Sequence, residues 1–264
     1  VGTGTEGLSE VPDLRVSTLT PSTLRLLESF GVGSGIAPPL SRPFENMQIW
    51  DASGKAGFVR FSGEAEGERV LGQVVENEVL KEALQGRAVK LGCELVLGDV
   101  SDLRLPRPAF GITKPPPPAQ EASGKGEADE ADDTMATIRF EGGPSIRTPL
   151  VVGADGANSF VARKAGIRSV SHKYGQRAVT CTVRTEVTGL GGHGTAFQRF
   201  LPTGPIALLP VRGGFSNIVW STTVPEARRL EGLDATGFAQ AVNEAFHSAG
   251  EGGGGAAGDG GGAG

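Results

Sequence analysis

The sequence predicts an α/β protein in which an α/β part is followed by a mostly antiparallel, β-rich part. Helical periodicity at residues 20–30 and 76–85 is interleaved with short apolar runs that are typical of strands. An apolar run at 150–152 leads through a turn of Gly and Asp into a helical pattern at 159–165, the local shape of a nucleotide-phosphate site in an α/β sheet. Four further apolar runs, separated by Gly and Pro turns, predict the antiparallel sheet: residues 179–187, 196–201, 206–211 and 217–223.

The elements in the first part of the chain follow from local signals. Residues 20–30 begin with a cap residue and a proline at the first helical position, which favours a short helix. Two apolar runs within residues 44–61 flank the segment DASG and indicate strands joined by a tight turn. An αβ step follows, with a helix at 76–85 and a strand at 93–97.

Further helices and strands are predicted after residue 135. Strands are predicted at 137–140 and 150–152, on either side of a double-glycine turn. A closing helix, broken by a glycine, is predicted at 230–248, with Asp234 or Thr236 as its cap.

Two segments are expected to be disordered. Residues 106–135 contain four consecutive prolines and an acidic run, and form an insertion too long and too polar for an ordinary loop. Residues 249–264 are a glycine-rich tail that cannot bury enough apolar surface to become ordered.

Composition excludes several classes of protein. The chain has 25 Lys plus Arg against 30 Asp plus Glu, a formal net charge of −5, which argues against nucleic-acid binding because that function needs a basic face. No apolar run approaches the roughly 18 residues of a membrane span, and no targeting segment is recognisable. Cysteine and histidine spacings predict neither a disulfide scaffold nor a metal site. We expect small buried apolar residues in a reducing compartment at Cys93 and Cys181, and surface or core residues at His172, His193 and His247.

Residues 2–7 match the G-x-G-x-x-G fingerprint of dinucleotide-binding proteins in residue types, but not in the predicted secondary structure around them. A functional fingerprint needs a strand before it and a helix after it, because the pyrophosphate sits on the N-terminus of that helix. Only Val1 precedes the pattern, and the residues after it contain Pro12 and no helical period. We interpret it as a chance match in a flexible segment.

A more specific motif, LVVGADGANSFVAR, occupies residues 150–163. It resembles the Asp-Gly motif of the class A flavoprotein monooxygenases, the single-component flavin aromatic hydroxylases. The resemblance implies that the motif lies under an extended FAD, where Asp155 accepts hydrogen bonds from sugar-like hydroxyls and Gly156 lets the backbone approach closely. A carboxylate would be repelled by the pyrophosphate, so the ribityl hydroxyls are its expected partners. The alternative is an Asp-Gly turn that caps an ordinary helix at Ser159.

Two further positions match the same family. Arg15 precedes a segment that looks like the family's second helix, and the resemblance makes it a candidate for contact with the flavin cofactor. Asn77 lies at the start of the next helix, where a Gln or Asn of the family contacts the ribityl chain, and its amide can both donate and accept. The alternatives are a surface arginine and a helix-capping asparagine.

The resemblance narrows to the UbiH-type FAD-dependent monooxygenases of ubiquinone biosynthesis, the mitochondrial ring C5-hydroxylases. It covers residues 12–248 outside the insertion. It rests on the Asp-Gly segment, on the runs at 15–19 and 44–51 (FENMQIWD), and above all on QRFLPTGPIALLP at 198–210 with IVWST at 218–222.

This resemblance implies a p-hydroxybenzoate hydroxylase-like fold. An incomplete Rossmann-like FAD-binding domain would be interleaved with a mostly antiparallel β-sheet substrate domain, whose sheet forms the lid over the flavin ring. The FAD-binding domain is expected at residues 1–41 and 72–170, and the substrate domain at residues 42–71 and 171–248.

The implied activity is hydroxylation at ring C5 of a polyprenylated 4-hydroxybenzoate-type intermediate by O₂, through a flavin C4a-hydroperoxide. The chain offers no residue that we assign as a catalytic acid, base or metal ligand. The implied partners are a ferredoxin with its reductase and other ubiquinone-biosynthesis proteins. The implied location is the matrix face of the mitochondrial inner membrane, with peripheral membrane association.

Two elements of the family are not recognisable in the sequence, namely the N-terminal strand with its G-x-G-x-x-G turn and the C-terminal Gly-Asp motif. We therefore expect the chain to be a fragment or an incomplete gene model. Two alternatives remain open, which are another class A aromatic-ring hydroxylase and a catalytically silent, truncated interaction or scaffold protein.

Overall fold

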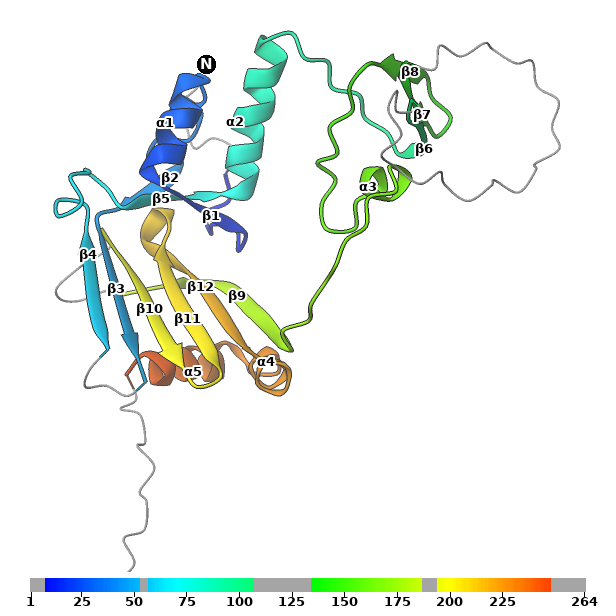
Figure 1. Cartoon of the computed structure of the whole chain (residues 1–264). Coiled ribbons are helices and arrows are strands. Elements are labelled where there is room, and N and C mark those ends of the chain that lie inside the picture. The colour runs from blue at the N-terminus through cyan, green and yellow to red at the C-terminus, as the bar shows by residue number, and fades with distance from the viewer. Residues whose placement is uncertain (1–7, 53–56, 107–133, 187–193, 248–264) are drawn as a thin grey trace, which may run out of the picture. The chain divides into compact units, whose positions relative to one another are not determined.

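The computed structural model describes residues 8–52, 57–106, 134–186 and 194–247. The glycine pattern at residues 2–7, the tail and nearly all of the predicted insertion lie outside these ranges. The fold is mixed α/β, and the described strands form three sheets (Figure 1).

The chain divides into two compact units. Unit 1 joins Val1–Cys93 to Lys173–Gly264, and unit 2 is Glu94–His172. These units do not coincide with the cofactor and substrate domains expected from the sequence, which stay a prediction.

A three-stranded sheet in unit 1 has β5 (Gly72–Glu76) at its centre, between β1 (Val16–Leu19) and β2 (Ser41–Phe44), and both neighbours are antiparallel to it. Successive side chains of a strand point to opposite faces. Val75 therefore packs with helices α1 and α2, while Val74 packs toward the larger sheet of this unit.

Both helices of this layer were predicted, and the structure confirms them. Helix α1 (Pro21–Ser29) begins at a proline, and the hydroxyl of its cap residue Thr20 accepts a hydrogen bond from the Thr23 amide at 3.3 Å. Helix α2 (Asn77–Lys90) extends beyond the predicted end, since its residues up to Lys90 are good helix formers apart from one glycine. A short 3₁₀ turn, η1 (Gly33–Gly35), follows α1.

The larger sheet of unit 1 confirms the predicted strands and their mostly antiparallel pairing. Only one neighbouring pair of its strands, β3 with β10, is parallel. The strand order is β4 (Phe58–Ser62), β3 (Asn46–Asp51), β10 (Thr195–Leu201), β11 (Gly204–Pro210), β12 (Phe215–Thr223) and β9 (Gln176–Arg184) (Figure 1).

Two helices cover one face of this sheet, where a single closing helix was predicted. Helix α4 (Val224–Glu231) starts earlier than expected, with a proline in its first turn, and helix α5 (Ala235–His247) follows. They pack on a core that includes Ile218 and Trp220 of β12. Asp234 is the cap of α5, because its carboxylate accepts the Gly237 amide at 2.7 Å.

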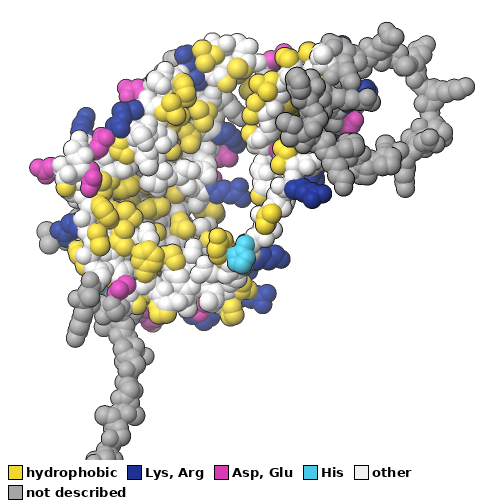
Figure 2. All heavy atoms as spheres, viewed as in Figure 1, with side chains coloured by type: hydrophobic (Ala, Val, Ile, Leu, Met, Phe, Trp, Pro, Cys, Tyr) yellow, Lys and Arg dark blue, Asp and Glu magenta, His cyan; other side chains and the backbone are white. Residues whose placement is uncertain are grey.

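The edge strand β4 leaves apolar side chains in solvent. Figure 2 shows hydrophobic side chains gathered over the region that Figure 1 labels β3, β4 and β10. On β4 itself, the exposed apolar residues are Phe58, Val59 and Phe61. Among the described strands, β4 pairs with β3 alone.

Unit 2 is a small hairpin sheet with one short helix. Strand β7 (Ala136–Phe140), which was predicted, lies between β6 (Val100–Arg104) and β8 (Ser145–Thr148). Helix α3 (Phe160–Lys164) is tied to β6 by an ion pair between Lys164 and Asp102 at 2.5 Å.

Two predicted strands are absent from the described structure, so these predictions were wrong. Neither residues 93–97 nor residues 150–152 pair with any described strand. Their apolar side chains lie in solvent, with Leu97 95% and Val152 78% exposed. A strand needs a hydrogen-bonded neighbour, and the apolar sequence alone does not provide one.

The two cysteines differ in environment. Cys93 is exposed, which corrects the expectation of a buried residue, because the segment that carries it is not part of a sheet. Cys181 is partly buried in β9, and burial raises the pKa of its thiol to about 11. His172 and His247 are exposed, while His193 lies outside the described residues.

In the part of the chain that the structure describes, no helix combines the length and the apolar character needed to cross a membrane.

Candidate cofactor-contact site

The corner where β1 and β5 run side by side brings together two of the residues predicted to contact a cofactor. Val16 pairs with Glu76 in the antiparallel ladder, so Arg15 and Asn77 continue the register one step further. The Asn77 amide donates to the Arg15 carbonyl at 2.9 Å. Arg15 and Asn77 are therefore direct backbone neighbours, although they lie 62 positions apart in the sequence.

The side chain of Asn77 does not cap α2, which was the alternative reading from the sequence. Glu76 is the N-cap, and the Asn77 amide oxygen instead accepts the Ser17 hydroxyl at 2.7 Å. Ser17 is the second residue of β1, and Arg15 directly precedes this strand, so the alternation of the extended chain places the two side chains on one face. Sequence reasoning missed Ser17, although strand alternation from Arg15 would have indicated it.

Hydrogen-bond donors remain available at this corner. Arg15 is exposed, and its guanidinium makes no hydrogen bond or ion pair with a described residue. The side-chain nitrogen of Asn77, Nδ2, likewise donates to no described residue. A guanidinium beside an amide suits a ligand that carries phosphate oxygens and hydroxyl groups.

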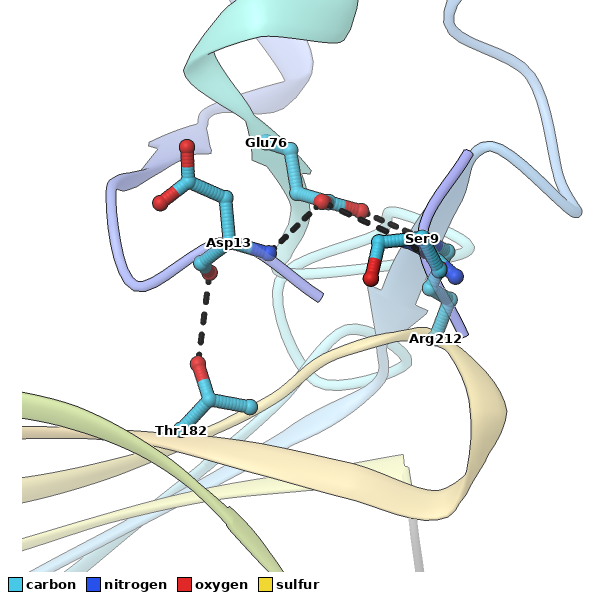
Figure 3. A network of polar contacts seen from close by, with 5 residues as sticks. All are labelled: Ser9, Asp13, Glu76, Thr182 and Arg212. Atoms are coloured by element: carbon cyan, nitrogen blue, oxygen red, sulfur yellow. Dashed lines mark hydrogen bonds and ion pairs between the residues drawn. The ribbon is translucent and has the colours of Figure 1, made fainter. Parts of the chain in front are cut away.

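On the opposite face of the corner, Glu76 forms a buried ion pair with Arg212 (Figure 3). The other carboxylate oxygen of Glu76 accepts the Asp13 amide at 2.7 Å, and Arg212 Nη2 also donates to the Ser9 carbonyl at 2.7 Å. Glu76, the last residue of β5, is thus buried, while Asn77, the first residue of α2, is exposed at the corner.

Asp155 and Gly156, the other two predicted contact residues, lie in unit 2 in the turn before α3. The Asp155 carboxylate accepts the Ser159 hydroxyl at 2.5 Å and the amides of Phe160 and Val161 at 2.6 and 3.1 Å. The Ser159 hydroxyl bond, followed by the backbone amides, lowers the pKa of the Asp155 carboxyl below 3.8. Asp155 therefore helps to cap α3, as the alternative reading of the motif proposed.

This capping leaves part of the carboxylate's capacity unused. A carboxylate offers about four acceptor positions, and the bonds to α3 occupy three of them. Gly156 has a φ of +84°, a conformation that glycine adopts without strain. Gly153 lies against α3, since a Cβ at this position would stand 2.9 Å from the side chain of Val161.

The four predicted contact residues thus form two local pairs. Arg15 lies with Asn77 in unit 1, and Asp155 lies with Gly156 in unit 2. The structure brings Arg15 and Asn77 together across the ladder, whereas Asp155 and Gly156 are adjacent in sequence.

The run RFLPTGPIALLP forms the hairpin of β10 and β11. Gly204 pairs with Leu201 at the hairpin end, and a Cβ on this glycine would overlap the Ser221 carbonyl of β12. Arg199 is 2% exposed and donates to the Ala245 carbonyl in the last turn of α5 at 2.8 Å. The run therefore fixes both the strand spacing and the helix that backs the sheet.

The part of the chain described by the structure contains no group of three or more His, Cys, Asp and Glu side chains placed to hold a metal ion.

No family model matches the chain. It is 37% identical over 235 residues to the mitochondrial ubiquinone biosynthesis monooxygenase COQ6 of Xenopus tropicalis, covering 89% of this chain and 46% of that protein. It is also 37% identical over 245 residues to the human COQ6, covering 92% of this chain and 48% of that protein. The chain spans about half the length of the curated relatives it matches.

Two solved structures show the fold. PqsL of Pseudomonas aeruginosa is 16% identical, with a TM-score of 0.59 over 83% of this chain and 53% of that one. HpxO of Klebsiella pneumoniae, complexed with FAD and uric acid, is 16% identical, with a TM-score of 0.54 over 88% of this chain and 52% of that one. The chain is a partial homologue of the COQ6 ubiquinone biosynthesis monooxygenases, and its fold is similar to that of PqsL and HpxO.

Proposed function

We propose that this chain, as a partial homologue of the COQ6 ubiquinone biosynthesis monooxygenases, binds FAD and contributes to hydroxylation of an aromatic ring in that pathway. The observation that carries the proposal is the exposed corner where Arg15 and Asn77 are backbone neighbours with donors not engaged by described residues. The homology to monooxygenases over about nine-tenths of this chain supports it.

The residues present fit the chemistry of FAD. Phosphate oxygens match the Arg15 guanidinium, and ribityl or ribose hydroxyls match the Asn77 amide. Asp155 retains one acceptor position for a hydroxyl donor, and Gly156 allows close approach of the backbone. We therefore assign Arg15, Asn77, Asp155 and Gly156 as the FAD-binding residues, and we add Ser17 because it orients Asn77.

When bound, reduced FAD supplies the activation of O₂. The chain's own contribution is to bind and orient the cofactor and substrate, and to exclude water from the reacting atoms. We assign no side chain as a catalytic acid or base. The proposed arrangement is an incomplete Rossmann-like FAD-binding domain (residues 1–41 and 72–170) interleaved with a sheet domain for the substrate (residues 42–71 and 171–248), as in p-hydroxybenzoate hydroxylase.

The proposed substrate is a polyprenylated 4-hydroxybenzoate-type intermediate, hydroxylated at ring C5. The proposed partners are a ferredoxin with its reductase and other ubiquinone-biosynthesis proteins, at the matrix face of the mitochondrial inner membrane. The relatives' names place them in ubiquinone biosynthesis and in mitochondria, which supports the pathway and the organelle in this proposal. The intermediate that accumulates when the gene is disrupted tests the step, and a C5-hydroxylated intermediate would contradict it.

The cofactor site is tested by titrating the full chain with FAD and following flavin fluorescence. We expect the wild-type chain to bind, and Arg15→Ala and Asn77→Ala each to raise the Kd about tenfold or more, since each removes hydrogen bonds to a polar or charged ligand. Arg25→Ala is the matched control, because it removes an exposed arginine that pairs with Glu68 elsewhere on unit 1.

Equal loss of binding in the Arg25→Ala control would show a general charge effect and contradict the assignment. A wild-type chain that binds no FAD would contradict the proposed function and favour a catalytically silent interaction protein.

A further inference from the structure

The segment that leads into β1 is held by side chains from distant parts of unit 1. Residues 9–15 form no described helix or strand. Their backbone is nevertheless bonded at several points. Arg212 Nη2 donates to the Ser9 carbonyl at 2.7 Å, Asn217 donates to the Leu14 carbonyl at 2.9 Å, and Thr182 donates to the Asp13 carbonyl at 3.3 Å. The carboxylate of Glu76 accepts the Asp13 amide (Figure 3).

The groups that hold this segment are themselves fixed. Glu76 is 6% exposed and Asn217 is fully buried. Arg212 is presented by the turn η3 (Arg212–Gly214) between β11 and β12, where Gly213 and Gly214 have φ values of +70° and +77°. These conformations favour glycine, so the turn sets the direction from which Arg212 approaches.

The ion pair joins this segment to the cofactor corner. Glu76 directly precedes Asn77, and Asp13, which Glu76 binds, lies two residues before Arg15. One carboxylate therefore fixes both chain segments of the corner, namely the one that carries Arg15 and the one that carries Asn77. Its second partner, Arg212, comes from the loop of the larger sheet.

We propose that Glu76 and Arg212 are positioning residues for the cofactor, which hold residues 9–15 and the start of α2 so that Arg15 and Asn77 face the flavin nucleotide together. The inference rests on the proposed function, because it assigns the pair a purpose in FAD binding. Arg212 suits this role better than a lysine would, since its planar guanidinium bonds the carboxylate and the Ser9 carbonyl at once.

The positioning role is tested with a variant that removes both members of the ion pair. Removing one member of a buried ion pair is strongly destabilising because it leaves an unpaired buried charge, and replacing both members together avoids this. The double variant Glu76→Gln with Arg212→Met should therefore fold, yet hold residues 9–15 less firmly. The matched control is Arg177→Met with Glu231→Gln, which removes an exposed ion pair of the same unit.

The test combines two measurements on the full chain: the Kd for FAD from flavin fluorescence, and hydrogen exchange of the apo protein by mass spectrometry. In the Glu76/Arg212 double variant we expect the Kd for FAD to rise about tenfold. Residues 9–15 would then be ordered only when FAD binds, and the free-energy cost of ordering them lowers the affinity. We also expect faster exchange in residues 9–17 and unchanged exchange in α5. The control variant should match the wild type in both measurements.

The outcomes separate this inference from the function on which it rests. Normal FAD binding by the double variant, or unchanged exchange in residues 9–17, would overturn the positioning role while the cofactor site stands. Failure of the wild-type chain to bind FAD would overturn the proposed function and the positioning role with it.

If circular dichroism shows the double variant to be unfolded, Arg212→Lys replaces it. This variant keeps the positive charge but loses the planar guanidinium. We expect it to exchange faster at residues 9–17 and to bind FAD more weakly than the wild type, and wild-type affinity would overturn the positioning role.

Discussion

At the scale of single residues, Asp155 shows how one carboxylate can serve a helix and still offer an acceptor to a ligand. It accepts the Phe160 and Val161 amides, which lie at the start of α3 and have no partner within the helix, and it also accepts the Ser159 hydroxyl. The sequence had presented helix capping and cofactor contact as alternatives. The geometry makes them compatible, since both use the ionised carboxylate.

The Asp155 carboxylate gives α3 a defined pH dependence. Its pKa is lowered in the folded chain, chiefly by the Ser159 hydroxyl bond. The stabilisation is therefore complete above the ordinary pKa of 3.8 and is lost as the pH falls through the lower, folded value. We expect the NMR shifts of the Phe160 and Val161 amides to titrate with a midpoint below 3.8.

In Asp155→Asn the same amides should show no such titration, because no carboxylate remains at the cap. A wild-type midpoint at or above 3.8 would contradict the capping geometry.

At the scale of elements, sequence patterns identify those with local causes. The cap and proline of α1 and the alternating strands of the larger sheet were predictable because their signals lie within the element. The segments at 93–97 and 150–152 have the same apolar character as strands, but pairing depends on a neighbour that their own residues do not specify. Strand β5 was missed for the related reason that its polar residues, Gln73 and Glu76, are buried by partners far away in sequence.

The hairpin of β10 and β11 depends on Gly204. Its φ is +136°, and a Cβ there would overlap the Ser221 carbonyl of the neighbouring strand. We expect Gly204→Ala to lower the free energy of unfolding by about 2–4 kcal/mol, from backbone strain and overpacking together. Urea denaturation followed by circular dichroism measures this change.

The matched control is Gly86→Ala, at a position within α2 where a Cβ would meet nothing within 4 Å. Alanine is a better helix former than glycine, so this change should stabilise the chain by about 0.5–1 kcal/mol. Equal effects of the two substitutions would contradict the role assigned to Gly204.

At the scale of the whole molecule, the candidate site was predictable in part. Arg15 and Asn77 were chosen by resemblance, and the structure places them side by side through the ladder of β1 and β5. Ser17 was missed although strand alternation from Arg15 would have indicated it. The ion pair of Glu76 with Arg212 was not anticipated, because a contact between residues 136 positions apart leaves no local pattern. The residue-level role of the site stays a proposal.

Hydrogen exchange with and without FAD shows whether the cofactor binds at the corner formed by Arg15 and Asn77. The full chain is measured by mass spectrometry at saturating FAD, with peptides that separate the corner from the rest of unit 1. We predict slower exchange at residues 15–17 and 77–79 in the presence of FAD, and no change in β4 or α4. Protection confined to other segments, or no protection at saturating FAD, would contradict the claim.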